Sequence, residues 1–200
     1  MRLYFSARCV AAITAATSLS AQVFPEPQKT TVNDYADMLS PEAEARVIET
    51  LTTLEDETGA QATIVTLSSV RFYASNLSVR DYATALFNEW GIGDAEKGDG
   101  VLLIVFRDDN QLRLTTGDGY DAAAKDRATR IVSDVIIPEF RAEAFEAGIE
   151  KGATAIADSL VRNVAEVAPV TALTSEGGGN ALWWVLGVVG AAIAGLVGWG

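Results

Sequence analysis

Histidine is absent from the 200 residues of this sequence, and cysteine occurs once. The lack of histidine excludes Ser-His-Asp and Cys-His catalysis and every His-ligated zinc or iron site. The single cysteine, Cys9, lies in a segment that we expect to be cleaved, so the mature chain has no disulfide and no thiolate. The chemistry left to the chain depends on carboxylates, hydroxyls, backbone amides, lysine and arginine.

Basic residues are also scarce. Fifteen Lys and Arg against 27 Asp and Glu give a formal net charge of −12. Such a charge disfavours nucleic acid as a partner, because phosphates require lysine and arginine to displace their counterions. Divalent cations and basic protein surfaces are better electrostatic partners.

The N-terminal end has the pattern of an exported protein. Arg2 and Arg8 precede a short apolar run, and small residues follow it up to Ala21. This pattern is typical of a signal peptide, and the run is too short to span a bilayer. We therefore expect residues 1–21 to be removed and the domain that follows to lie on the extracytoplasmic, periplasmic side.

The C-terminal end predicts a membrane anchor. Residues 181–200 carry no charge and only apolar or small side chains. As a helix they would extend roughly 30 Å, the thickness of the hydrocarbon layer, so they predict one transmembrane helix. Residues 166–180 have low complexity and no periodicity, which predicts a flexible linker. A stripe of small residues would allow two such helices to pack closely in a homodimer: Gly187, Ala191 and Gly195.

The region between these ends, 22–165, predicts a single α/β domain. Three segments have the apolar patterns of strands: 61–67, 101–106 and 111–116. Three amphipathic segments predict helices. They start at Ser40, at Ser78 and at about Asp126, and the third has a break near Pro138. The resulting order predicts a three-layer α/β/α sandwich on a small mixed sheet, in which the first two strands are parallel and the last two form a hairpin.

Two acidic, glycine-rich loops should meet at one edge of this sheet. Loop 91–100 enters the second strand, and the hairpin returns the chain so that 117–126 leaves the third strand at the same end. Six acidic residues lie in these loops: Asp94, Glu96, Asp99, Asp118, Asp121 and Asp126. Carboxylates brought together in this way either share a hard cation, with Ca²⁺ favoured over Mg²⁺, or form a solvated acidic rim. Spacing alone leaves both alternatives open.

Three motifs in this order resemble the TPM domain family. The first motif is Val32-Asn33-Asp34-Tyr35-Ala36 with Leu39-Ser40. The second, 91–105, reads GIGDAEKGDGVLLIV, and the third, 130–156, reads RIVSDVIIPEFRAEAFEAGIEKGATAI. The resemblance implies an α/β/α sandwich with a signal peptide and a membrane tail, divalent-metal binding by acidic loops, and an accessory role in maintaining or assembling membrane protein complexes. It also implies a disputed acid-phosphatase activity.

The resemblance also implies which residues bind the metal. Asp34, Asp99 and Asp126 occupy acidic positions that recur in the family, and Asp121 stands where Glu is usual. Lys125 replaces the usual Thr before Asp126, so an ammonium group would lie beside the predicted metal.

Three classes of function follow from these features. The first is a membrane-anchored accessory module that binds a divalent metal and a membrane protein complex. The second is a metal-dependent phosphatase for phosphomonoesters, in which a metal-bound water attacks phosphorus. Its phosphate clamp would have to come from Lys97, Lys125 and Arg127. The third is an inert spacer without a partner.

Overall fold

The computed structural model describes residues 23–162. The predicted signal peptide, linker and transmembrane helix therefore lie outside the described residues. Within 23–162, no helix is both long enough and apolar enough to cross a membrane.

A four-stranded sheet in the order β1-β2-β3-β4 forms the centre of the domain. β1 pairs with β2 and β2 with β3 in parallel, whereas β3 and β4 form an antiparallel hairpin. The strands are β1 (Val32–Asp34), β2 (Ala62–Leu67), β3 (Val101–Phe106) and β4 (Gln111–Thr116). The α/β fold with a small mixed sheet is thereby confirmed. β1 was not predicted, because three residues are too few to show a strand periodicity.

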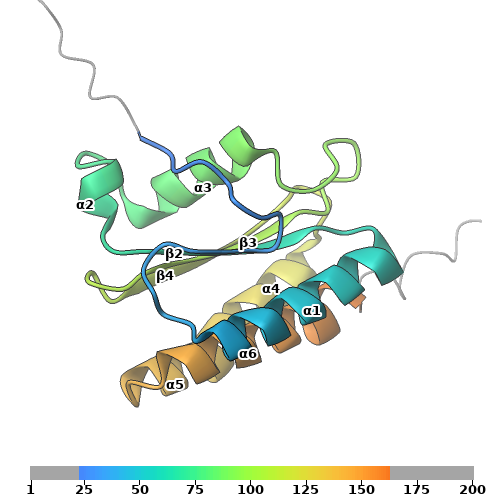
Figure 1. Ribbon diagram of the computed structural model, residues 1–200. Helices are drawn as coiled ribbons and strands as arrows, with labels where there is room; N and C mark the ends of the chain where they lie inside the picture. Colours follow the sequence, from blue (N-terminus) through green and yellow to red (C-terminus); the bar gives the residue numbers. More distant parts are fainter. Residues whose placement is uncertain (1–22, 163–200) are drawn as a thin grey trace, which may run out of the picture. The chain divides into compact units, whose positions relative to one another are not determined.

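Helices cover both faces of the sheet (Figure 1). One face carries α1 (Pro41–Thr58), α4 (Ala122–Arg130), the π-helix η1 (Ile131–Ile136), α5 (Ile137–Arg141), α6 (Phe145–Ala155) and the π-helix η2 (Ile156–Arg162). The other face carries α2 (Val70–Tyr73) and α3 (Val79–Trp90).

The helical segment after β4 differs from its prediction at both ends. It starts at Ala122, before the predicted Asp126, because Asp121 caps the helix through its side chain. The predicted break near Pro138 lies a few residues further on, because η1 runs into α5 without a gap and Pro138 is the second residue of α5. The break comes after Arg141, and α6 starts at Phe145.

The two connections between parallel strands leave the sheet on opposite sides. α1, between β1 and β2, packs on one face, and α3, between β2 and β3, packs on the other. The chain moves across the sheet in the same direction both times, so the two crossovers have opposite hands and one is of the rare left-handed kind. As a consequence, the loops that leave β1 and β2 diverge from each other.

The start of α1 is tied to the start of α6. Ser40 caps α1 by accepting a hydrogen bond from the Ala43 amide at 3.2 Å. The Ser40 amide in turn donates to Glu146 Oε2 at 2.7 Å. This bond, together with the nearby Arg46, holds the pKa of Glu146 below its ordinary value.

A pH dependence follows from this bond. A carboxyl whose pKa is lowered by folding stabilises the folded state above its ordinary pKa, and the contribution disappears as the pH falls through the lowered value. Glu146→Gln cannot ionise, so we expect it to unfold at lower urea concentration than the wild type at pH 7 and to approach the wild type below about pH 4. Urea unfolding from pH 7 to 3 measures this, with Glu143→Gln, an exposed neighbour, as control. A difference from wild type that stays constant over this range would contradict the assignment.

Candidate functional site

The two glycine-rich loops meet at the amino end of β3, as the topology predicts. The Gly117 amide donates to Gly100 O at 2.9 Å, and the Gly119 amide donates to Gly98 O at 3.0 Å. The buried Tyr120 closes the contact by donating its hydroxyl to Asp99 O at 2.9 Å. We call this surface, formed by 91–100 and 117–121, the amino edge.

Glycine is required at the amino edge because the two backbones touch. A Cβ at Gly119 would lie 2.0 Å from Lys97 O, and one at Gly117 would lie 2.2 Å from Gly98 O. No side chain fits into either gap. The two glycines of the Gly117-x-Gly119 motif are therefore explained by loop packing.

Carboxylates at the amino edge hold the backbone of their own loops. Asp94 Oδ1 accepts from the amides of Glu96 at 2.8 Å and Lys97 at 3.1 Å, and these bonds lower the pKa of Asp94. Asp99 Oδ1 accepts from the Asp94 amide at 2.8 Å. Asp121 Oδ1 caps α4 at 2.7 Å. Each of these groups has a structural task that explains its position.

The four predicted metal ligands do not converge. Asp34 is the last residue of β1 and pairs with Thr66 near the carboxyl end of β2, whereas Asp99 precedes the first residue of β3. Asp34 and Asp99 therefore lie at opposite edges of the sheet. Asp126 is exposed on α4, about 140° around the helix axis from Asp121. Among the described residues, no group of three or more Asp, Glu, His or Cys side chains could hold a metal ion.

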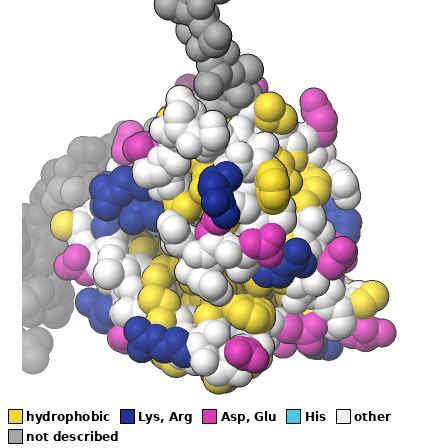
Figure 2. All heavy atoms as spheres, turned by 90° about the vertical axis from the view of Figure 1, so that its left-hand side faces the viewer, with side chains coloured by type: hydrophobic (Ala, Val, Ile, Leu, Met, Phe, Trp, Pro, Cys, Tyr) yellow, Lys and Arg dark blue, Asp and Glu magenta, His cyan; other side chains and the backbone are white. Residues whose placement is uncertain are grey.

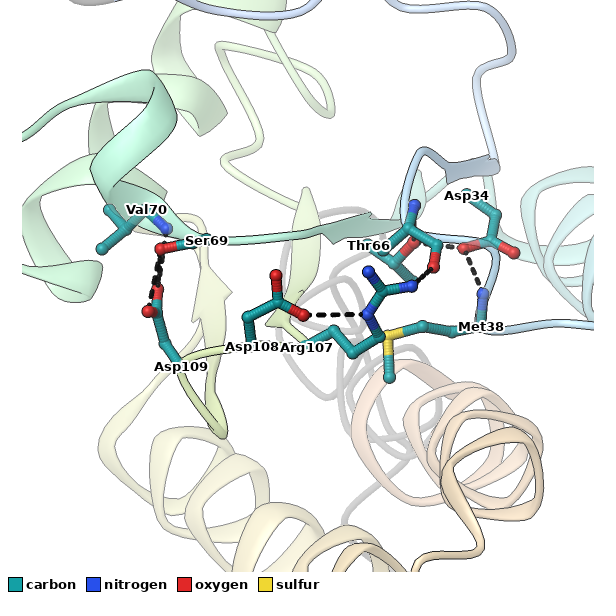
Figure 3. A network of polar contacts seen from close by, with 9 residues as sticks. Asp34, Met38, Thr66, Ser69, Val70, Arg107, Asp108 and Asp109 are labelled. Atoms are coloured by element: carbon teal, nitrogen blue, oxygen red, sulfur yellow. Dashed lines mark hydrogen bonds and ion pairs between the residues drawn. The ribbon is translucent and has the colours of Figure 1, made fainter.

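Asp34 belongs instead to a polar network at the carboxyl edge of the sheet (Figure 3). Its two oxygens accept from the amides of Met38 at 3.0 Å and Leu39 at 2.9 Å, and its Oδ1 also accepts from the Thr66 hydroxyl. The carboxylate thus fixes the loop between β1 and α1. Because the loop is fixed, Asp37 is held with a positive φ of 50°.

Arg107 and Asp109 complete this network from the turn between β3 and β4. The Arg107 guanidinium donates to Ala36 O and, through Nε, to Asp108 Oδ1 at 3.0 Å. Asp109 accepts from the Ser69 hydroxyl at 2.8 Å and from the Val70 amide at 2.7 Å, and so caps α2. Loops from β1, β2 and β3 are therefore joined across the carboxyl edge.

A cleft of about 450 Å³ opens beside Arg107. Asp37, Glu143 and Glu146 contribute its acidic wall, and Met38 and Phe145 are among the other lining residues. Figure 2 shows this end of the molecule, with basic and acidic side chains interspersed around apolar ones. Diverging loops create such crevices at the carboxyl ends of parallel strands.

The sequence did not indicate this cleft. Its position follows from β1, which was not predicted, and from the turn between α5 and α6, where Glu143 has a positive φ of 61°. One signal was available: Arg107 directly follows a continuous apolar run, which marks the carboxyl end of a buried strand.

Close backbone packing at the amino edge gives a stability prediction. Gly119→Ala forces the two loops apart, and we expect it to lower the free energy of unfolding by about 3 kcal/mol. The control is Gly91→Ala, which meets nothing within 4 Å and is strained only by its φ of 59°, a cost of about 1 kcal/mol. Urea denaturation of the two variants measures both values. Equal losses would show that the loops tolerate separation.

Comparison with known proteins agrees with the fold and with the motifs. The N-terminal domain of a P. gingivalis protein is 26% identical, with a TM-score of 0.58 over 68% of this chain and 83% of that one. The N-terminal domain of a Corynebacterium glutamicum protein shares the fold with 13% identity and a TM-score of 0.53, over 78% of this chain and 95% of that one. The BA42 protein of the psychrophilic bacterium Bizionia argentinensis shares it with 20% identity and a TM-score of 0.51, over 64% of this chain and 85% of that one. No curated protein matches. Residues 32–159 match the TPM domain family, more than half of the sequence, and the chain therefore belongs to that family.

Proposed function

We propose that this chain is a membrane-anchored, extracytoplasmic accessory module that binds a partner membrane protein or complex. The sequence supports the location, since a signal-like start and an apolar segment at 181–200 flank the domain. The TPM domain is then the part that makes contact with the partner.

One observation carries the binding function: carboxylates at both edges of the sheet are used to hold loops. Asp34, Asp94, Asp99, Asp109 and Asp121 all accept hydrogen bonds from backbone amides. Fixed loops bind a partner without a large loss of conformational entropy. Such fixed loops are suited to the recognition of a partner protein. The carboxylates that fix them already accept hydrogen bonds from the backbone.

The alternative, a metal-dependent phosphatase, finds less support in the geometry. Its metal and its phosphate clamp would have to lie together. Two of the predicted clamp residues lie at different places. Lys97 lies in the amino edge, with its Nζ 4.0 Å from Asp94 Oδ2 of the same loop, whereas Lys125 lines a separate groove along β4. We therefore favour binding over turnover.

Calcium binding by Asp34, Asp99, Asp121 and Asp126 stays a prediction. Two of the four, Asp99 and Asp121, belong to the loops of the amino edge, and in each it is Oδ1 that accepts an amide, so Oδ2 is the oxygen offered to calcium. Titration calorimetry of the full-length chain with CaCl₂ should give a binding isotherm that EDTA abolishes. We expect Asp99→Asn/Asp121→Asn to weaken binding about tenfold or more, because two anionic ligands are lost.

Two controls separate this site from other acidic residues. Asp56→Asn, at an exposed position of α1, should bind Ca²⁺ as the wild type does. Asp34→Asn should also retain binding, because Asp34 lies at the opposite edge. Absence of heat with the wild type, or unchanged binding by the double variant, would remove calcium from the proposal.

Photo-crosslinking tests the accessory role itself. A photo-reactive amino acid in place of Asp118, which is exposed at the amino edge, should crosslink the full-length chain to a distinct membrane protein in intact membranes. The same amino acid in place of Asp56 on α1 is the control. If neither position gives a product, or if both give the same products, the chain is a spacer and the accessory role is wrong.

A further inference from the structure

Strand β4 has one free side. It is the last strand in the order β1-β2-β3-β4, so β3 occupies only one of its two edges. No other strand of the described residues pairs with its outer edge. Natural edge strands usually carry a proline, a bulge, charged side chains or a covering element that prevents further pairing. β4 has no proline, its register against β3 runs without a bulge, and Arg113 is its one charged residue.

The hydrogen bonds at the ends of the hairpin show which backbone groups face outward. Gly117 donates to Gly100 O, so this pair is of the hydrogen-bonded type, and such pairs alternate along an antiparallel ladder. The residues of β4 that bond to β3 are then Gln111, Arg113 and Thr115. The amide and carbonyl groups of the alternate residues point away from the sheet: Leu112, Leu114 and Thr116.

A groove of about 390 Å³ runs along this outer edge, between β4 and α4. The α4 side of the groove, continued into η1, is formed by Lys125, Ala128, Thr129 and Val132, which have the spacing of one helix face. Figure 1 shows α4 on the sheet face next to β4. A strand placed beside β4 would therefore lay alternate side chains against this helix.

Polar atoms on β4 lack partners within the described domain. Arg113 Nε and Thr115 Oγ1 are buried atoms without a hydrogen bond in the described residues, although both side chains also line the groove. They pair with Ile104 and Leu102, whose side chains face α3, so they lie on the α3 side of the strand. Buried polar atoms without partners are costly, and a ligand that supplies acceptors recovers that cost.

We propose that this groove binds an extended segment of the partner protein, which adds to the sheet as a fifth strand beside β4. This inference rests on the proposed binding function and names how the partner is held. The backbone of the segment bonds to Leu112, Leu114 and Thr116. Its side chains on one face pack against α4, and an acidic side chain on the other face pairs with Arg113. A second copy of this chain is disfavoured as occupant by its net charge of −12.

A synthetic peptide can test the mode of binding. The probe is a nine-residue peptide in which valine and threonine alternate around a central glutamate, added to the isotope-labelled full-length chain in detergent micelles. We expect the amide signals of Leu112, Leu114 and Thr116 to shift to saturation in NMR spectra and their hydrogen exchange to slow. The same peptide N-methylated at alternate residues should bind about tenfold more weakly, since it lacks the donors that face β4.

A matched pair of variants locates the binding in the groove. Thr129→Arg on α4 places a bulky cation in the groove, and we expect it to weaken peptide binding about tenfold. Thr84→Arg on α3 is the control, because both threonines are exposed on a helix and donate their hydroxyls to the carbonyl four residues earlier, at 3.0 and 3.1 Å. Thr84→Arg should bind the probe as the wild type does.

Several outcomes would overturn the proposal. These are no shifts up to millimolar peptide, equal binding of the N-methylated peptide, and slow exchange of the three amides before peptide is added. If the signals of these three amides change with protein concentration in the absence of peptide, two copies of the chain pair through β4 instead. If the crosslinks from position 118 persist while the peptide fails, only the groove is wrong; if both fail, the binding function is wrong as well.

Discussion

Burial of β3 on both faces is the constraint on which the rest of this domain depends. All six of its side chains are at most 1% exposed, and they alternate between two separate cores. A strand of this kind must be covered by a helical layer on each side and paired along both edges. α1, α4 and α6 cover one side, α3 covers the other, and β2 and β4 supply the pairing. The loops at the two ends of β3 are consequently fixed in place, and the amino edge and the cleft beside Arg107 lie at those ends.

Carboxylates at these two edges serve the fold first. Residues 23–162 contain neither histidine nor cysteine, and here the domain fixes its loops with side-chain oxygens that accept from backbone amides. Asp34 holds the loop after β1, Asp109 caps α2, and Asp94 holds the turn before β3. A charged acceptor bonded to amides makes a stronger hydrogen bond than a neutral one. This structural use explains why so many acidic residues occur in the loops, whether or not a metal ion binds there.

The opposite hands of the two crossover connections shape the surface of the domain. Because α1 and α3 lie on different faces, the loops after β1 and β2 diverge, and Arg107 reaches between them to Ala36 O. The same order of strands leaves β4 at an edge, with α4 beside its outer side. The two ends of the sheet and the outer side of β4 thus have different characters. They carry closely packed glycine loops, a cleft with acidic walls, and a groove with unpaired backbone groups.

The sequence by itself determined the local features. The apolar run 101–106 gave a buried strand, the alternation of 111–116 gave the hairpin, and Ser40 and Ser78 marked the starts of α1 and α3. These features depend on neighbours along the chain, and the family motifs depend on them as well. Tertiary structure alone decided where β1 pairs, and therefore that Asp34 lies across the sheet from Asp99. A strand of three residues has no periodicity of its own. It is defined by its pairing with β2, whose residues lie about thirty positions further along the chain.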